Sequence, residues 1–391
     1  MRESLRGVDR HNLVNALVAW LFAISGPVVI ILAVGRQGGL RAEDISSWVF
    51  AAFVFGGLLT MTFSYIFRQP IAIMWTIPGA VLVGGALQHL SFPEVIGSYL
   101  VCGLLIAVLG ITGLVRRIMA AIPMSIVMAM VAGVFLPFGL NIITAFEEAT
   151  VMAGAMVAAF ALPTAIPRLG RVLPPVLCAL GAGTIVIITS GQMDGVDIPP
   201  LALAQPIIYT PEFTLRALGE LVVPLAVTVI AAQNAQGFVI LRQAGFEPPE
   251  NNLTLTCGLG SLLFGIFGSV PTCVTGPANA ILNTSGIKER RYMAGVIFGL
   301  LAIGFGLFSP FTTGLGLGLP VVFINLLGGL AMLAVLQGAF TTAFGGAHAL
   351  GALVSFLVTL SNVALFNVGA PFWGLVFGYI VTLILRHRGE K

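Results

Sequence analysis

Three carboxamide side chains lie within four residues of one long apolar stretch: Gln233, Asn234 and Gln236. An amide carries both donors and an acceptor, and leaving them without partners in an apolar environment costs free energy. Hydrogen bonding between neighbouring helices would satisfy any one of the three. The cluster as a whole favours a binding site for a polar solute, and we expect Gln233 and Asn234 to lie nearest to it.

Two other apolar stretches, 70–88 and 269–284, are interrupted by prolines and glycines in the sequences TIPG at 76–79 and TGPA at 275–278. A threonine N-cap and a proline in the first turn are typical of a helix start. Helix N-termini attract anions through unpaired N–H groups and the helix dipole. Two such starts that meet would bind a small monoanion, or a neutral polar solute, without a cationic side chain. The residues predicted to line this site are Thr76, Pro78, Gly79, Thr275, Gly276 and Pro277.

Weaker candidates surround these helix starts. Ser25 precedes a Gly–Pro pair and Asn279 lies one turn into the second start, so both join the predicted binding residues. Trp75, Phe22 and Phe138 are candidates for an aromatic wall, although aromatic residues of apolar helices usually serve packing.

Three titratable residues, Glu220, His89 and His348, are the candidate proton carriers. Imidazole titrates near neutral pH, and a carboxyl group does so when it is desolvated. The alternative for each is a position at a helix end or loop exposed to water.

Other kinds of chemistry lack their residue patterns. The sequence contains no HExxH and no GxSG pattern, which argues against an intramembrane enzyme. No CxxC spacing occurs, and all the cysteines lie in apolar stretches as expected of buried thiols: Cys102, Cys178, Cys257 and Cys273. We therefore expect no catalytic residue, no metal site and no cofactor.

The elements that position these residues must lie in a lipid bilayer. Of 391 residues, 58% are hydrophobic and 8% are charged, with a mean hydropathy of +1.05. A soluble domain carries about 25% charged residues. This composition excludes a soluble enzyme, a nucleic-acid binder and a disordered chain.

Twelve continuous apolar stretches and the two broken ones predict fourteen transmembrane segments. If both broken stretches cross and both termini are cytoplasmic, 15 Lys and Arg residues fall inside and only Arg36, Arg41 and Arg216 outside. If neither crosses, the split is 11 to 7. Because cytoplasmic loops retain Lys and Arg, fourteen crossings are favoured.

Fourteen segments divide into two copies of seven, and an odd number inverts the second copy. Prolines in equivalent segments recur at separations of 197 or 199 residues: Pro27 and Pro224, Pro78 and Pro277, Pro123 and Pro320, Pro174 and Pro371. The predicted fold is an all-α polytopic membrane protein with broken half-helices, each with room for a short preceding strand, in segments 3 and 10. The first inverted repeat would occupy 1–190, a linker 191–217 and the second repeat 218–391.

Four motifs resemble the benzoate transporter (BenE) family, and the similarity extends along essentially the whole chain. They are AAQNAQGFVILRQAGF at 231–246, RQPIAIMWTIPGA at 68–80, GITGLVRRIMAAIP at 110–123 and APFWGLVFG at 370–378. The resemblance implies a multi-pass symporter of the bacterial inner membrane that takes up benzoate, or a related aromatic acid, with protons.

The resemblance also implies the seven-plus-seven fold of nucleobase permeases and sulfate/anion exchangers. In that fold a core domain, here about 13–117 plus 218–314, binds the substrate between segments 3 and 10. It moves against a gate domain, here about 118–190 plus 315–388, which commonly forms a homodimer interface.

This chain departs from the nucleobase permeases, which typically carry acidic residues in segments 8 and 10. The corresponding positions here are Gln233, Asn234 and Asn279, which suit an anionic substrate but leave the proton carrier unassigned. We expect a secondary active transporter that works by alternating access, in an elevator-like motion. Transport of another small anion or a nucleobase is the alternative. An ion channel is less favoured because it needs a continuous polar path.

Overall fold

The computed structural model describes residues 9–389 apart from 116, 118–122, 167–169, 171–173, 192–198, 285, 347, 364 and 366–368. Within these residues the chain is mostly helical, with one two-stranded sheet. The predictions for both chain termini, for Arg116, Arg168 and Arg171 and for the middle of the linker fall outside the described residues.

Among the described residues, seven helical stretches are each long and apolar enough to span a bilayer, so the chain is a polytopic membrane protein. They are α2 (Arg10–Ser25) with α3 (Pro27–Gln37); α4 (Ala42–Phe50), η1 (Ala51–Phe55) and α5 (Gly56–Phe67); α7 (Phe92–Thr112); α9 (Met124–Glu148); α13 (Leu215–Val227), η2 (Thr228–Asn234) and α14 (Ala235–Gln243); η3 (Lys288–Arg290) with α17 (Tyr292–Leu307); and α19 (Val321–Phe344). The other helices that the structure describes in full outside the two broken stretches are α10 (Thr150–Ala165), α12 (Pro175–Thr189), α15 (Glu250–Ile266), α18 (Ser309–Gly318), α20 (Ala349–Leu360) and α21 (Ala370–Gly389).

The two broken stretches each fold as a short strand followed by a short helix. The first forms β1 (Ile73–Trp75) and α6 (Ile77–Ala86), and the second forms β2 (Thr272–Val274) and α16 (Gly276–Leu282). A proline occupies the first turn of both helices, where its missing N–H removes no helical hydrogen bond. The breaks therefore follow from local sequence.

The two strands pair antiparallel about a local two-fold axis. The register joins Ile73 to Val274, Met74 to Cys273 and Trp75 to Thr272. A shift of 199 residues, the spacing of Pro78 and Pro277, maps β1 onto β2 and leaves this register unchanged. The relation supports an inverted repeat, because a two-fold axis in the membrane plane exchanges segments of opposite direction.

A π-helical turn, η2, follows Pro224 and contains the amides Gln233 and Asn234. Proline inside a helix removes a backbone donor, and widened turns accommodate the irregularity. Two of the three clustered amides thus lie in an irregular part of the helix, and the third, Gln236, lies in the first turn of α14.

Glycines allow two pairs of helices to approach closely. A Cβ on Gly57 of α5 would lie 2.5 Å from the carbonyl oxygen of Gly299 on α17, and a Cβ on Gly299 would lie 2.5 Å from that of Gly57. Between α7 and α15, a Cβ on Gly110 would lie 2.4 Å from the nitrogen of Leu255. Small residues drive such packing where hydrophobic attraction between helices is absent.

One segment differs from its predicted extent. One of the twelve continuous apolar stretches covers 292–313, but its first helix, α17, ends at Leu307, and α18 begins at Ser309. Pro310 in the first turn of α18 explains the break, because a helix readily starts there but continues poorly through it.

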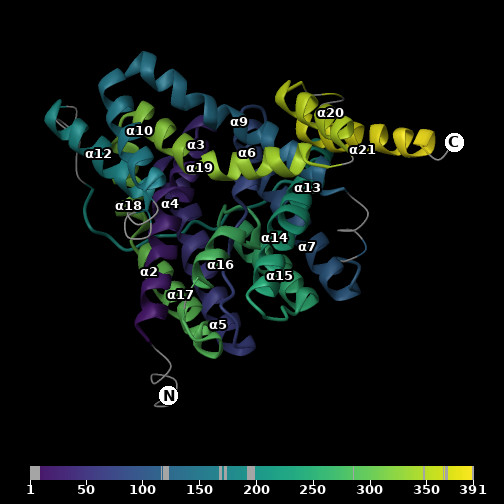
Figure 1. Cartoon of the computed structure of the whole chain (residues 1–391), viewed down its shortest axis with the longest axis horizontal. Coiled ribbons are helices and arrows are strands. Elements are labelled where there is room, and N and C mark those ends of the chain that lie inside the picture. Colours follow the sequence, from purple (N-terminus) through teal and green to yellow (C-terminus); the bar gives the residue numbers. More distant parts are fainter. Residues whose placement is uncertain are drawn as a thin grey trace.

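Helices of the predicted gate domain lie beside some helices of the predicted core domain. In Figure 1, α9, α10, α12, α19, α20 and α21 lie in the upper part of the view together with α3 and α6, and α2, α5, α14, α15, α16 and α17 lie below them. The linker residues 204, 209 and 212 donate backbone hydrogen bonds to Leu307, Ile266 and Pro93.

Candidate functional site

The two broken segments meet beside a small cavity of about 20 Å³. Three aromatic side chains, Phe22, Trp75 and Phe298, line it together with the start of α16. Trp75 is only 3% exposed, and its indole Nε1–H has no hydrogen-bond partner among the described residues. The cavity is thus bordered by three aromatic residues, and one of them, Trp75, has a buried N–H group without a partner among the described residues.

The threonines that precede α6 and α16 have different roles. The Thr76 hydroxyl accepts a hydrogen bond from the Gly79 N–H at 3.2 Å and donates one to the Thr228 hydroxyl at 3.1 Å. Thr275 makes no side-chain cap, is buried and lines the small cavity. Of the residues predicted from the TIPG and TGPA motifs, Thr275 is the one that borders this cavity.

The predicted amides hold the strands in place. Asn234 is fully buried, and its Oδ1 accepts a hydrogen bond from the Val274 N–H at 2.7 Å. Asn279 Oδ1 accepts one from the Ala72 N–H at 3.0 Å, while its Nδ2 donates to the carbonyl oxygens of Ala72 at 3.2 Å and Thr275 at 2.6 Å. Both side chains thus satisfy backbone groups that the broken segments leave unpaired.

Gln233 is buried as well, and its Oε1 has no hydrogen-bond partner among the described residues. It borders neither the small cavity nor the larger one described below. Ser25 donates to the Phe22 carbonyl oxygen of its own helix at 3.3 Å. The binding roles of these amides and of Ser25 stay predictions.

The remaining predicted residues pack tightly around the two helix starts. Pro78 and Gly79 are buried, and a Cβ on Gly79 would lie 2.3 Å from the Thr76 Cγ2. A Cβ on Gly276 would lie 2.3 Å from Gln236 Oε1, whereas Pro277 is partly exposed. The two glycines therefore leave little room between segments.

Sequence reasoning missed Phe298, a buried residue of α17 that completes the aromatic lining. Its side chain belongs to a long apolar run, where no local signal separates it from packing residues. Phe22 and Trp75 were candidates for an aromatic wall, and both line the small cavity.

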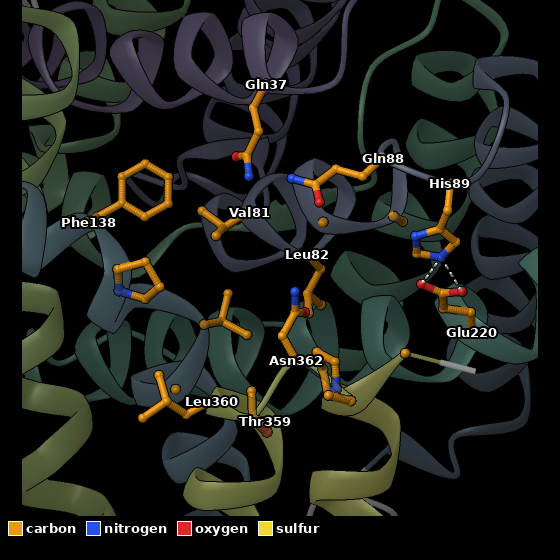
Figure 2. A pocket seen from close by; sticks show the side chains of 18 residues that line it. Gln37, Val81, Leu82, Gln88, His89, Phe138, Glu220, Thr359, Leu360 and Asn362 are labelled. Atoms are coloured by element: carbon orange, nitrogen blue, oxygen red, sulfur yellow. Dashed lines mark hydrogen bonds and ion pairs between the residues drawn. The ribbon is translucent and has the colours of Figure 1, made fainter. Parts of the chain in front are cut away.

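A larger cavity of about 310 Å³ lies between α6 and α13 on one side and α9, α20 and α21 on the other (Figure 2). Val81, Leu82, Phe138 and Leu360 provide apolar surface. The polar side chains that line it are Gln37, Gln88, His89, Glu220, Thr359 and Asn362. Its volume falls within the range of about 300–1,000 Å³ typical of small-molecule sites.

Two of the three candidate proton carriers meet in this cavity. His89 Nε2 lies 3.1 and 3.0 Å from the two carboxylate oxygens of Glu220, 131 residues away in sequence. The Glu220 side chain is 6% exposed and that of His89 is 35% exposed. His348, at the N-terminal end of α20, borders neither cavity.

The comparison with known families decides the identity of the chain. The sequence pattern of the BenE family, benzoate membrane transport protein, matches residues 8–384. The chain belongs to the BenE family. The inner membrane protein YdcO of Escherichia coli is 31% identical over 395 residues, which cover 99% of each chain. The benzoate membrane transport protein of Acinetobacter baylyi is 25% identical over 380 residues, covering 95% of this chain and 94% of that protein.

Solved structures relate the BenE fold of this chain to anion transporters. The transmembrane domain of the cyanobacterial bicarbonate transporter BicA aligns with a TM-score of 0.61 at 15% identity, over 96% of this chain and 98% of that domain. The murine anion transporter Slc26a9, in its inward-facing state, aligns with a TM-score of 0.63 at 12% identity, over 97% of this chain and 69% of that one. The chain is a membrane transport protein rather than an enzyme.

Proposed function

We propose that this protein is a secondary active transporter for benzoate or a related small aromatic carboxylate. The carrying observation is the cavity where the two broken segments meet. Its walls are the rings of Phe22, Trp75 and Phe298, which suit an aromatic guest, and Thr275 and the Trp75 indole offer hydroxyl and N–H groups to a carboxylate. The name of the Acinetobacter relative supports the same substrate class.

The substrate needs a conformational change to enter. A cavity of about 20 Å³ has room for roughly one water molecule and excludes an aromatic acid. The larger cavity of about 310 Å³ borders α6 and α13 of the proposed core, 13–117 plus 218–314, and α9, α20 and α21 of the proposed gate, 118–190 plus 315–388. An elevator-like motion of the core against the gate would open the small cavity to each side in turn.

The proposal includes the fourteen-segment inverted topology in the bacterial inner membrane, with both termini cytoplasmic and a homodimer formed through the gate. Single cysteines at Arg41 and Lys288, introduced into a cysteine-free variant, test the topology. We expect an impermeant maleimide to label position 41 from outside and position 288 only after permeabilisation. The opposite labelling would contradict the topology, and a monomer by mass photometry would contradict the dimer.

Binding and counterflow test the transport function. We expect benzoate, but not uracil, bicarbonate or sulfate, to raise the melting temperature of the purified protein, since a ligand stabilises the form that it binds. Radiolabelled benzoate should exchange in proteoliposomes at equal pH on both sides. Stabilisation by uracil or an inorganic anion instead would transfer the proposal to that substrate. A current without saturable exchange would indicate a channel.

A substitution in the small cavity tests its location. Trp75→Phe keeps an aromatic, although smaller, ring and removes the N–H, so we expect benzoate affinity to fall by about tenfold, the value of one hydrogen bond to a charged group. Trp48→Phe is the matched control, because Trp48 is also buried with an unpartnered Nε1 but does not line the cavity. Equal benzoate affinities of Trp75→Phe and Trp48→Phe would contradict the location of the substrate site in the small cavity.

A further inference from the structure

The larger cavity contains one titratable pair in an otherwise uncharged lining. Among the described residues that border it, His89 and Glu220 are the only ones with an imidazole or a carboxyl side chain. Figure 2 shows the imidazole of His89 directed at the Glu220 carboxylate, with the amides of Gln37, Gln88 and Asn362 elsewhere on the wall.

The Glu220 carboxylate lies near residues on both sides of the larger cavity. Both carboxylate oxygens lie within hydrogen-bond distance of His89, and Gly369, which precedes α21, lies close to Oε1, since a Cβ on this glycine would lie 2.8 Å from that oxygen. Glu220 and His89 belong to the proposed core and Gly369 to the proposed gate. A displacement of the core against the gate would therefore change the water exposure of the pair.

The charged residues on the helices next to the His89–Glu220 pair either bond to other residues or are exposed. On α7, Glu94 accepts hydrogen bonds from Ser91 and Thr214. On α13, Arg216 is exposed one turn before Glu220. On α3, Arg36 donates to the carbonyl oxygens of Leu317 and Leu319.

The elements that form the gate side of the cavity bring no further charge to it. Helix α20 carries no Asp, Glu, Lys or Arg between 349 and 360, and the acids of α9, Glu147 and Glu148, lie at its C-terminal end. On α21 the charged residues begin at 386, some four turns beyond the part that borders the cavity.

Charge balance links this pair to an anionic substrate. The described lining of the small cavity contains no cationic side chain, so a carboxylate that the core carries there adds one negative charge without a counter-ion. An uncompensated charge away from bulk water is costly. One proton bound by Glu220 cancels the added charge, and its release to the opposite side restores the pair.

We propose that the His89–Glu220 pair binds the proton that is carried together with the carboxylate. The inference rests on the proposed function, because it names the coupling site of the same transporter. The proton moves from external water to a Glu220 oxygen and leaves when that oxygen is exposed inside, so that no other bond forms or breaks.

Glu220→Gln tests the coupling. In proteoliposomes we expect benzoate accumulation driven by an inward proton gradient to be lost to the level of protein-free liposomes. Benzoate counterflow at equal pH should persist, at a reduced rate, because exchange needs no net proton movement. Glu94→Gln is the matched control, a nearby carboxylate that does not line the cavity, and it should retain gradient-driven accumulation.

Several outcomes separate the two proposals. Gradient-driven accumulation by Glu220→Gln at the wild-type level would overturn the proton site and leave the transport function intact. Absence of counterflow in the wild type would overturn the proposed function itself. If Glu220→Gln does not fold, Glu220→Asp and His89→Gln replace it. Either must shift the external pH at which uptake is half-maximal, and an unchanged pH profile in both would overturn the proposal.

Discussion

Thr76 and Thr275 occupy equivalent positions 199 residues apart, and their backbone N–H groups make equivalent hydrogen bonds. The Thr76 N–H donates to the Pro271 carbonyl oxygen and the Thr275 N–H to that of Ala72, each at 3.0 Å. Only Thr76, however, caps its helix with its hydroxyl. The backbone is symmetric, while the side chains have separated into one that stabilises a helix start and one that faces the small cavity.

The two threonines should therefore respond differently to the same substitution. Thr76→Val removes a cap and a buried hydrogen bond to Thr228, and we expect it to lower the free energy of unfolding by about 1–2 kcal/mol. Thr275→Val should change stability by less than about 0.5 kcal/mol and weaken benzoate binding. Thermal unfolding in detergent, with and without benzoate, measures both effects. Equal losses of stability would show that the asymmetry has no energetic consequence.

Asn279 offers a test between a structural and a binding role. Asn279→Ala leaves the Ala72 N–H without its side-chain acceptor, and we expect a loss of about 1–3 kcal/mol of stability. Asn252→Ala, at an exposed position in the first turn of α15, is the control and should change stability little. If Asn279→Ala unfolds at the wild-type temperature but no longer binds benzoate, the side chain contacts substrate instead.

The glycine contact between α5 and α17 predicts a strong size effect. In Gly299→Val the new side chain meets the Gly57 carbonyl oxygen and the Met61 backbone, so the helices must separate. We expect a loss of at least about 1–3 kcal/mol. Gly304→Val on the same helix is the control, since nothing lies within 4 Å of a Cβ there. The melting temperatures of Gly299→Val and Gly304→Val in detergent measure the difference. Similar values for the two variants would contradict the close contact.

Tyr209 connects the linker to α4. Its hydroxyl donates to Asp44 Oδ1 at 2.7 Å, and burial together with this hydrogen bond raises the pKa of the phenol. A group whose pKa is raised by folding stabilises the protein below its unfolded pKa, which is about 10 for tyrosine, and this contribution declines at higher pH.

Tyr209→Phe should therefore lower the melting temperature at neutral pH and reduce the further decline above about pH 10. Melting curves between neutral pH and pH 11 measure the difference between variant and wild type. Tyr65→Phe is the control, because Tyr65 is exposed and contacts the cation of Arg68 through its ring. An identical alkaline decline in the wild type and Tyr209→Phe would contradict this role.

The amino-acid sequence by itself determined the class of protein and the places where segments break. A chain with so few charged residues must lie in a bilayer, and prolines such as Pro78 and Pro277 interrupt a helix whatever its tertiary surroundings. These are local or compositional properties. The family resemblance, carried by contiguous motifs, is confirmed by the match over residues 8–384.

The tertiary structure alone decided which side chains meet. Asn279 and Ala72 lie 207 residues apart, and His89 and Glu220 lie 131 apart, so no local pattern announces either contact. Gln233 and Asn234 had the strongest sequence signal, yet neither borders the small or the larger cavity. Asn234 instead accepts a hydrogen bond from the backbone N–H of Val274 in β2. An amide in an apolar helix must find some partner, and only the crossing of the segments determines whether that partner is backbone or ligand.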